Sequence, residues 1–195
     1  QLFLEAARRI PDRADPHANL AFLYHVLGRV DEAIAHGQAA VAIDPNHLLA
    51  HVNLAQSLLL AGDYAHGWPH YEWRPPDDRL STLPRWHGED FAGARVLVSR
   101  EQGLGDFIAL ARFFPGLAAR GVTLTVEAPA AALPLVASFD GIDEVRSEGD
   151  LGDLGRYAAY VPIASIPSVL GVGIDTIPAA PYLRADAARA RRFAE

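Results

Sequence analysis

The feature that most constrains the fold is an internal repeat of 34 residues in the first part of the chain. Residues of one type recur at this interval: Ala6 and Ala40, Pro11 and Pro45, Asn19 and Asn53, Leu20 and Leu54, Ala21 and Ala55, Gly28 and Gly62. Such a period is typical of stacked units that each contain two helices joined by a turn. Glycine suits the turn, and the small alanines let paired helices approach closely. The sequence therefore begins with a stack of helical hairpins.

These residue types at this period form the tetratricopeptide pattern. One complete repeat runs from about Ala14 to His47, after a half repeat and before a degenerate one. In the degenerate repeat Gly67 replaces the alanine found at Ala33, so we expect its second helix to be short or distorted. We assign residues 1–74 to these repeats. Because such stacks bind other chains on an extended surface, the expected partner is a protein or peptide.

Two asparagines, Asn19 and Asn53, occupy equivalent positions on the first helices of successive repeats. We expect both to line one peptide-binding groove, because an amide both donates and accepts hydrogen bonds and so suits a peptide backbone. Similar asparagine rows line the repeats of the protein O-GlcNAc transferases. The alternative is that both are ordinary polar residues without a ligand.

Seven of the eight histidines precede residue 71. His47 and His51, and likewise His66 and His70, have the one-turn spacing that can hold zinc. Neither pair has the intervening glutamate of the metalloprotease motif. We therefore predict no metal site.

After Arg74 the helical period ends in a segment rich in proline and aspartate, and residues 75–92 are predicted to be a linker. Residues 93–195 then alternate between strands and helices. The expected strands are Ala94–Ser99, Val122–Glu127, Asp143–Arg146 and Tyr160–Ile163, and the expected helices are Phe107–Ala119, Ala130–Ser138 and a short one near Ser168–Leu170. Crossover helices between strands imply a parallel sheet covered on both faces. The predicted fold class is α + α/β, with tetratricopeptide hairpins followed by a Rossmann-like domain.

Composition excludes several kinds of chemistry. The chain has no cysteine, and all 17 basic residues are arginine, so a thiol nucleophile, a Schiff-base lysine and a phosphate-loop lysine are excluded. The net charge of −7 without a basic stripe argues against nucleic acid. The apolar run 161–174 is too short to span a bilayer and no signal peptide is visible, so we expect a cytoplasmic protein. Because the chain lacks methionine and starts and stops within expected helices, we expect a fragment of a longer protein.

The segment best placed for chemistry is the loop Glu101–Asp106 after the first strand, because open α/β sheets bind ligands at the carboxyl ends of their strands. A dinucleotide fingerprint requires glycine where Ile108 stands. However, Glu127 ends the second strand about where a ribose-binding acid is expected. A nucleotide-binding oxidoreductase half therefore stays open as a third alternative.

Within this loop Asp106 has two interpretations: it caps the following helix, or it is a general base that deprotonates an acceptor hydroxyl. Glu101 could orient the substrate or share that task. Gln102, Gly103 and Gly105 are candidate substrate-binding residues, and both glycines are expected to meet the backbone requirements of a tight turn.

The stretch Val96–Asp106, VLVSREQGLGD, resembles the first strand and loop of bacterial tetratricopeptide-repeat proteins with a heptosyltransferase-like domain of the glycosyltransferase family 9 type. Further matching segments are Trp68–Trp73, Trp86–Gly88, Leu133–Val136, Gly141–Val145, Pro162–Pro167 and Ile177–Leu183. The resemblance implies a two-lobed GT-B fold, of which residues 93–195 are the amino-terminal, acceptor-side half, with Asp106 at the position of the proposed catalytic base. It also implies that the nucleotide-sugar donor binds a missing carboxyl-terminal lobe, so no cofactor is expected on this chain. Ala158 and Ala159 depart from the family, whose members commonly carry an aspartate there.

The leading hypothesis from the sequence is a fragment of a repeat-containing glycosyltransferase, inactive in isolation, that contacts a protein partner and a glycosyl acceptor. The alternative is a non-catalytic assembly module whose α/β domain is a degenerate remnant.

Overall fold

The computed structural model describes residues 2–136, 139–184 and 191. It forms two compact units. The repeat unit comprises Gln1–Pro76 with Gly171–Thr176, and the sheet unit comprises Asp77–Leu170 with Ile177–Glu195.

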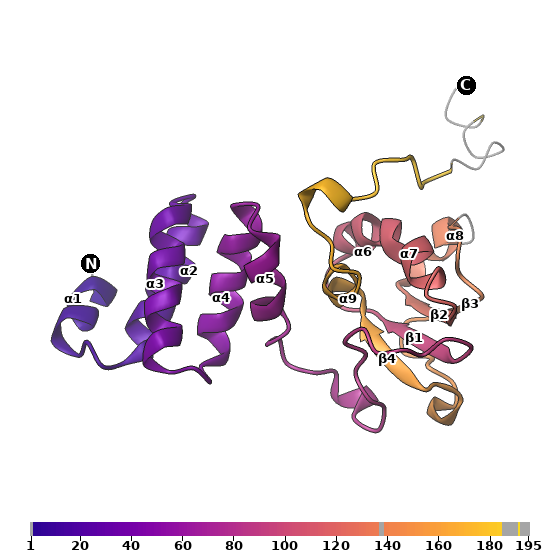
Figure 1. Ribbon diagram of the computed structural model, residues 1–195, viewed down its shortest axis with the longest axis horizontal. Coiled ribbons are helices and arrows are strands. Elements are labelled where there is room, and N and C mark those ends of the chain that lie inside the picture. Colours follow the sequence, from indigo (N-terminus) through magenta and orange to yellow (C-terminus); the bar gives the residue numbers. More distant parts are fainter. Residues whose placement is uncertain (1, 137–138, 185–190, 192–195) are drawn as a thin grey trace. The chain divides into compact units, whose positions relative to one another are not determined.

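The repeat unit consists of antiparallel helices that follow one another along the chain (Figure 1). They are α1 (Leu2–Arg9), α2 (Ala14–Val26), α3 (Val30–Ile43), α4 (Leu48–Leu60) and α5 (Tyr64–Tyr71). Gly28 and Gly62 turn the chain after α2 and α4 with φ of 72° and 84°, a left-handed conformation that glycine adopts without strain. Part of the core consists of buried alanines, namely Ala14, Ala18, Ala40 and Ala50. The period-related Ala21 and Ala55 are also fully buried, so the repeated glycines and these alanines act as the sequence predicts.

The last helix of the repeat unit is short, as expected for a degenerate repeat. It spans eight residues, whereas α3 spans 14. Gly67 lets α5 lie close to α4, since a Cβ added to it would come within 2.7 Å of the Leu59 side chain. Trp68 donates its indole N–H to the carbonyl of Val172 at 2.8 Å, which joins Gly171–Thr176 to this unit.

The sheet unit contains a four-stranded parallel sheet, so the predicted fold class is confirmed. Its strands are β1 (Arg95–Ser99), β2 (Thr123–Ala128), β3 (Glu144–Ser147) and β4 (Ala159–Pro162). Their order is β3-β2-β1-β4, which is the order of a Rossmann half.

One face of the sheet is covered by α6 (Leu104–Leu110), α7 (Phe114–Ala118) and α8 (Leu133–Val136) (Figure 1). Their core includes edge-to-face contacts of Phe114 with Phe107 and Phe139. The helix predicted over Phe107–Ala119 is instead divided by a 3-10 turn, and α7 begins beside Pro115, whose ring suits the first turn of a helix but not its interior. Of the helix predicted over Ala130–Ser138, α8 ends at Val136, and residues 137–138 lie outside the described residues.

The opposite face differs from the expected helical cover. There Leu97 and Tyr160 of the sheet pack against segments that contain only short 3-10 turns and no α-helix, through Leu80, Leu83, Leu151, Leu154 and Tyr157. Trp86 is 1% exposed and donates its backbone N–H to the Tyr160 carbonyl at 2.7 Å. From Asp77 onward, the segment predicted as a linker is therefore part of the sheet unit. The short helix α9 (Ile166–Val169) follows β4.

Candidate functional site

The strand order creates one topological switch point in the sheet. The chain runs outward from β1 to β2 and β3 and then returns to place β4 on the other side of β1. Connections after β1 and β4 therefore diverge at the carboxyl edge between these strands, where open α/β sheets bind ligands. The loop Glu101–Asp106 begins at this point.

Glu101 ties together the segments that follow the two strands. Its carboxylate Oε1 accepts the backbone N–H of Ala164 at 3.0 Å, just beyond β4. Nearby, Arg85 donates from Nη2 to the Ser165 hydroxyl at 2.9 Å. Glu101 therefore holds the loop after β1 against the segment that follows β4.

The tight turn in this loop is made by Gln102 and not by a glycine. Gln102 has a φ of 67°, a left-handed value that costs a non-glycine residue free energy and that is common at functional sites. Gly103 has a φ of −82°, and Gly105 also lies outside the left-handed region. The expectation that the glycines meet backbone requirements of the turn is therefore wrong. A Cβ added to Gly105 would meet no atom within 4 Å, so the space before this part of α6 is open.

Asp106 is an exposed residue in the first turn of α6. Its Oδ2 accepts the N–H of Gly103 at 3.2 Å, the capping contact that the sequence leaves open as one interpretation. Its Oδ1 accepts no hydrogen bond from the described residues, and so stays available to a substrate. Asp106 thus accepts a backbone N–H from its own loop, whereas Glu101 accepts one from the segment after β4.

Glu127 is fully buried at the end of β2. Its two oxygens accept from Arg79 Nη1 at 2.7 Å and Nη2 at 3.1 Å, and from the backbone N–H of Arg100 and Gly149, each at 3.0 Å. The pKa of the Arg79 guanidinium is raised by its hydrogen bonds to Asp77 and to Glu127. A carboxylate has about four acceptor positions, all of which are occupied here. Glu127 is consequently not placed to bind a ribose hydroxyl, and the oxidoreductase alternative loses its main support.

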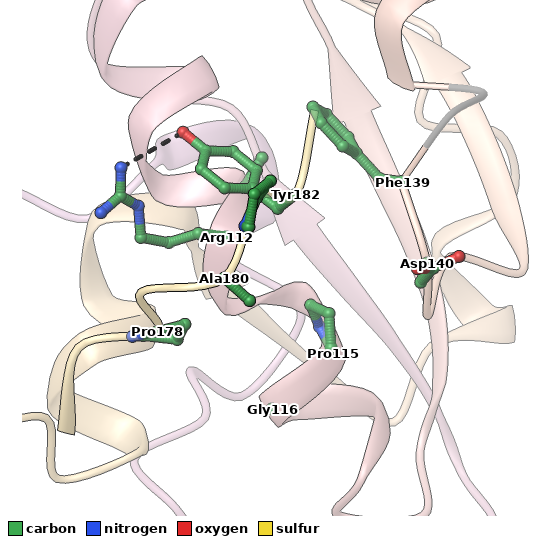
Figure 2. Close-up of a pocket in the computed structure, with 10 residues that line it drawn as sticks. Arg112, Pro115, Gly116, Phe139, Asp140, Pro178, Ala180 and Tyr182 are labelled. Atoms are coloured by element: carbon green, nitrogen blue, oxygen red, sulfur yellow. Dashed lines mark hydrogen bonds between the residues drawn. The ribbon is translucent and has the colours of Figure 1, made fainter. Parts of the chain in front are cut away.

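A separate pocket, which the sequence does not indicate, has a volume of about 280 Å³ in the sheet unit. Figure 2 shows Tyr182 between Arg112 and Phe139, with Pro115 and Pro178 also on the wall. The Tyr182 hydroxyl donates to the Ile108 carbonyl at 3.0 Å, and the Arg112 guanidinium lies 5.0 Å from the centre of its ring. Because Arg112 follows the C-terminal end of α6 and Asp106 lies in its first turn, this pocket is distinct from the loop at the switch point.

In the repeat unit, both candidate groove residues use their amide donors within the scaffold. Asn19 donates to the Asp15 carbonyl and Asn53 to the Ala18 carbonyl, both at 2.9 Å. Their Oδ1 atoms accept no hydrogen bond within the described part of the chain. At one-turn or two-turn spacing from them lie exposed apolar side chains, namely Phe22, Val26, Leu49 and Leu60. The faces of α2 and α4 that carry the asparagines therefore offer free acceptors beside apolar surface.

Comparison with known proteins identifies part of the repeat unit. Residues 14–47 match the tetratricopeptide repeat family, the same stretch that the 34-residue period marks as a complete repeat. The chain therefore contains a tetratricopeptide repeat. The matched repeat covers helices α2 and α3.

Over longer stretches the chain is similar to two proteins. It is 34% identical over 125 residues to Protein FlbA of Caulobacter vibrioides, a match that covers 59% of this chain and 21% of FlbA. A mutant of the Thermobaculum terrenum O-GlcNAc transferase matches with 17% identity and a TM-score of 0.35, over 78% of this chain and 38% of the transferase. The chain thus spans a minor part of both proteins. No helix within the described ranges is long and apolar enough to cross a bilayer.

Proposed function

We propose that the chain is the acceptor-side part of a two-lobed, heptosyltransferase-like glycosyltransferase whose repeats bind a protein partner or acceptor. The observation that carries the proposal is the position of Asp106. Its exposed carboxylate lies in the first turn of α6, in the loop that leaves β1 at the switch point beside β4. The resemblance of Val96–Asp106 to the heptosyltransferase-like family supports the same assignment.

In this proposal Asp106 acts as a general base. Its free Oδ1 takes the proton of an acceptor hydroxyl while the hydroxyl oxygen attacks the anomeric carbon of the donor sugar. The bond between that carbon and the phosphate oxygen of the nucleotide breaks, and the nucleotide leaves with the bonding electrons. The acceptor approaches over Gly105, whose missing side chain leaves open space, while Gln102 and Gly103 complete the binding loop. Glu101 holds the loop in place through Ala164. The donor binds a second lobe, so this chain needs no cofactor of its own.

The test uses the full-length natural protein. It is incubated with radiolabelled UDP-, GDP-, ADP- and CMP-sugars and an extract of host cells that lack the gene. The proposal predicts transfer of label from one donor class to an acceptor in the extract. Absence of transfer from all four classes, with the protein folded, would contradict it.

A second candidate function is a non-catalytic protein-binding module. The observation that favours it is that both loop carboxylates have structural partners, Asp106 with Gly103 and Glu101 with Ala164. The tetratricopeptide repeat is consistent with binding of a protein partner. Stable association with a host protein, without sugar transfer, would establish this function in place of the first.

Replacement of Gly105 by alanine separates the two candidates. The added methyl group meets no atom within 4 Å, and alanine favours helix, so the free energy of unfolding should rise by about 0.5–1 kcal/mol in urea titrations. In the transferase the same methyl group occupies the acceptor path and should lower the transfer rate by roughly 10- to 100-fold. Gly173→Ala, at another open glycine outside this loop, is the control and should leave transfer unchanged. A normal transfer rate for Gly105→Ala would show that the acceptor does not approach over this loop.

Replacement of both Asn19 and Asn53 by alanine tests the role of the repeats. Loss of two amide acceptors should weaken partner binding by about tenfold or more, at about 1 kcal/mol for each hydrogen bond. The measurement is recovery of partner proteins from host extract on the immobilised full-length protein, quantified by mass spectrometry. Gln38→Ala, which removes an exposed amide from α3, is the control. Equal recovery by the double variant and by the control would show that the asparagines do not bind the partner.

A further inference from the structure

The histidines of the repeat unit form contacts that repeat with the same 34-residue period. His17 Nδ1 lies 3.0 Å from His36 Nδ1 between α2 and α3. His51 Nδ1 lies 2.7 Å from His70 Nδ1 between α4 and α5. His51 and His70 are the period-related equivalents of His17 and His36, so each hairpin is joined by the same histidine pair.

These pairs differ from the one-turn pairs that the sequence suggests as zinc ligands. His47 contacts Asp15 at 3.3 Å, and His66 contacts Asp63 at 2.8 Å. Among the described residues, no group of three or more histidine or acidic side chains is placed to hold a metal ion. The first histidine of each one-turn pair thus contacts an acidic side chain.

The hydrogen bonds fix the protonation state of the second pair. His51 donates from Nε2 to the Pro45 carbonyl at 2.9 Å, so its neutral ring has no proton on Nδ1. That Nδ1 accepts the Nδ1–H of His70. This bond between α4 and α5 survives one added proton, because an imidazolium still donates to a neutral imidazole. It breaks when both rings are charged, since two N–H groups then face each other. The first pair has the same constraint, because two Nδ1 atoms can share only one bridging proton.

The rings are also held by aromatic neighbours, which limits their ability to turn away. His36 stacks on Tyr24 with ring centroids 5.4 Å apart, and His51 stacks on Trp73 at 3.9 Å. Rotation of either imidazole would break this stacking contact. Protonation therefore acts on the contact between the helices and not on a freely rotating side chain.

Burial is the main factor that opposes protonation of His36 and His70. Burial and the neighbouring His17 lower the pKa of His36, against a smaller opposing effect of Glu32, which is itself paired with Arg29. Burial, His51 and His66 lower the pKa of His70. The helices packed across the hairpins add two further histidine contacts, His25 with the Ser57 hydroxyl at 3.2 Å and His47 with Asp15.

We propose that the histidine pairs make the repeat unit a proton-sensitive element, in which mild acid loosens the α2–α3 and α4–α5 hairpins. Since the pKa of each affected histidine is lower in the folded state, the unfolded state binds more protons below a pH of about 6.5. The stabilisation by each pair is complete above that pH and is lost as the pH falls toward the folded-state pKa. The folding equilibrium of the repeat unit changes by a maximum of about tenfold for each unit by which a pKa is lowered.

Hydrogen–deuterium exchange of the full chain tests the proposal, with the sheet unit as internal control. Exchange is measured at about pH 7.5 and about pH 5.5, which bracket the ordinary histidine pKa, and is corrected for the intrinsic pH dependence of amide exchange. We expect protection of amides in α2–α5 to fall by about tenfold or more at the lower pH relative to amides in β1–β4. Equal change in the two units would overturn the proposal.

Glutamine variants assign the effect to the pairs. His36→Gln with His70→Gln removes one titratable group from each pair while keeping an amide donor, and should abolish most of the difference between the two pH values. His66→Gln, at a side chain that is 75% exposed, is the matched control on α5 and should retain the difference. If the double variant does not fold, an NMR pH titration of the histidine ring resonances of the wild-type chain tests the proposal instead. His36 and His70 must titrate below a pH of about 6.5, and titration of both at or above that value would overturn the proposal.

Discussion

Arg79→Ala should destabilise the sheet unit by roughly 2–3 kcal/mol, a large effect for a residue in a single turn of 3-10 helix. The substitution leaves the fully buried Glu127 carboxylate with two backbone donors and no cation. We place the effect below the full cost of breaking a buried ion pair because the Arg79 side chain is 44% exposed. Urea unfolding of the full chain, followed by circular dichroism and by exchange of the β1–β4 amides, measures the change.

The control for this prediction is Arg184→Ala. Arg184 also pairs with a carboxylate of the sheet unit, Asp140, at 2.9 Å, but the two side chains are 71% and 72% exposed. Its removal should change the free energy of unfolding by less than about 0.5 kcal/mol. Similar values for the two variants would show that Arg79 and Glu127 do not form a structural clamp.

The ion pair between Arg79 and Glu127 also supports the backbone next to the candidate site. Glu127 accepts the backbone N–H of Arg100, the residue before Glu101. The end of β1 is thereby joined to Arg79 through one carboxylate. We expect loss of Arg79 to increase exchange at Arg100 and in the following loop before the rest of β1 is affected.

The repeats could be predicted from the sequence because their determinants are local and periodic. Gly28 and Gly62 provide the left-handed turns that the period marks, and the buried alanines provide close helix packing. The strands were likewise located to within one or two residues. The fourth strand, Ala159–Pro162, is displaced by one residue from the predicted Tyr160–Ile163.

Contacts between distant residues could not be predicted in this way. Arg79 and Glu127 are 48 positions apart, and no spacing connects them. Leu80 and Trp86 lie in a proline-rich segment without apolar periodicity, yet they are buried because they cover a sheet face that no local pattern reveals. The histidine pairs follow no local spacing either, because their contacts join neighbouring helices, whereas one-turn spacing relates residues next to each other along the chain.

In the candidate site the sequence located the loop but not its conformation. The glycines suggested the tight turn, whereas Gln102 adopts the left-handed backbone. Glutamine rarely adopts this conformation, so residue type pointed to the wrong position. A non-glycine residue in this conformation is itself an indicator of function that only the structure provides.

Asp106→Asn should lower sugar transfer by the full-length protein by about 10²- to 10⁴-fold, the usual contribution of a general base. Asparagine has nearly the same shape, and its carbonyl oxygen can still accept the N–H of Gly103, so the cap of α6 is kept. What is lost is the ability to take a proton from the acceptor hydroxyl. Unfolding by urea should therefore differ from wild type by less than about 0.5 kcal/mol, while the transfer rate falls.

The matched control is Asp153→Asn. Asp153 caps another turn of the sheet unit by accepting the N–H of Gly155 at 2.9 Å, and it lies far along the chain from the loop. The direct test of the account is the rate of sugar transfer by the full-length protein carrying Asp106→Asn, measured beside Asp153→Asn at saturating donor and acceptor. We predict a loss of at least about 100-fold for Asp106→Asn and a rate close to wild type for Asp153→Asn. A transfer rate for Asp106→Asn that equals that of Asp153→Asn would contradict the assignment of Asp106 as the catalytic base.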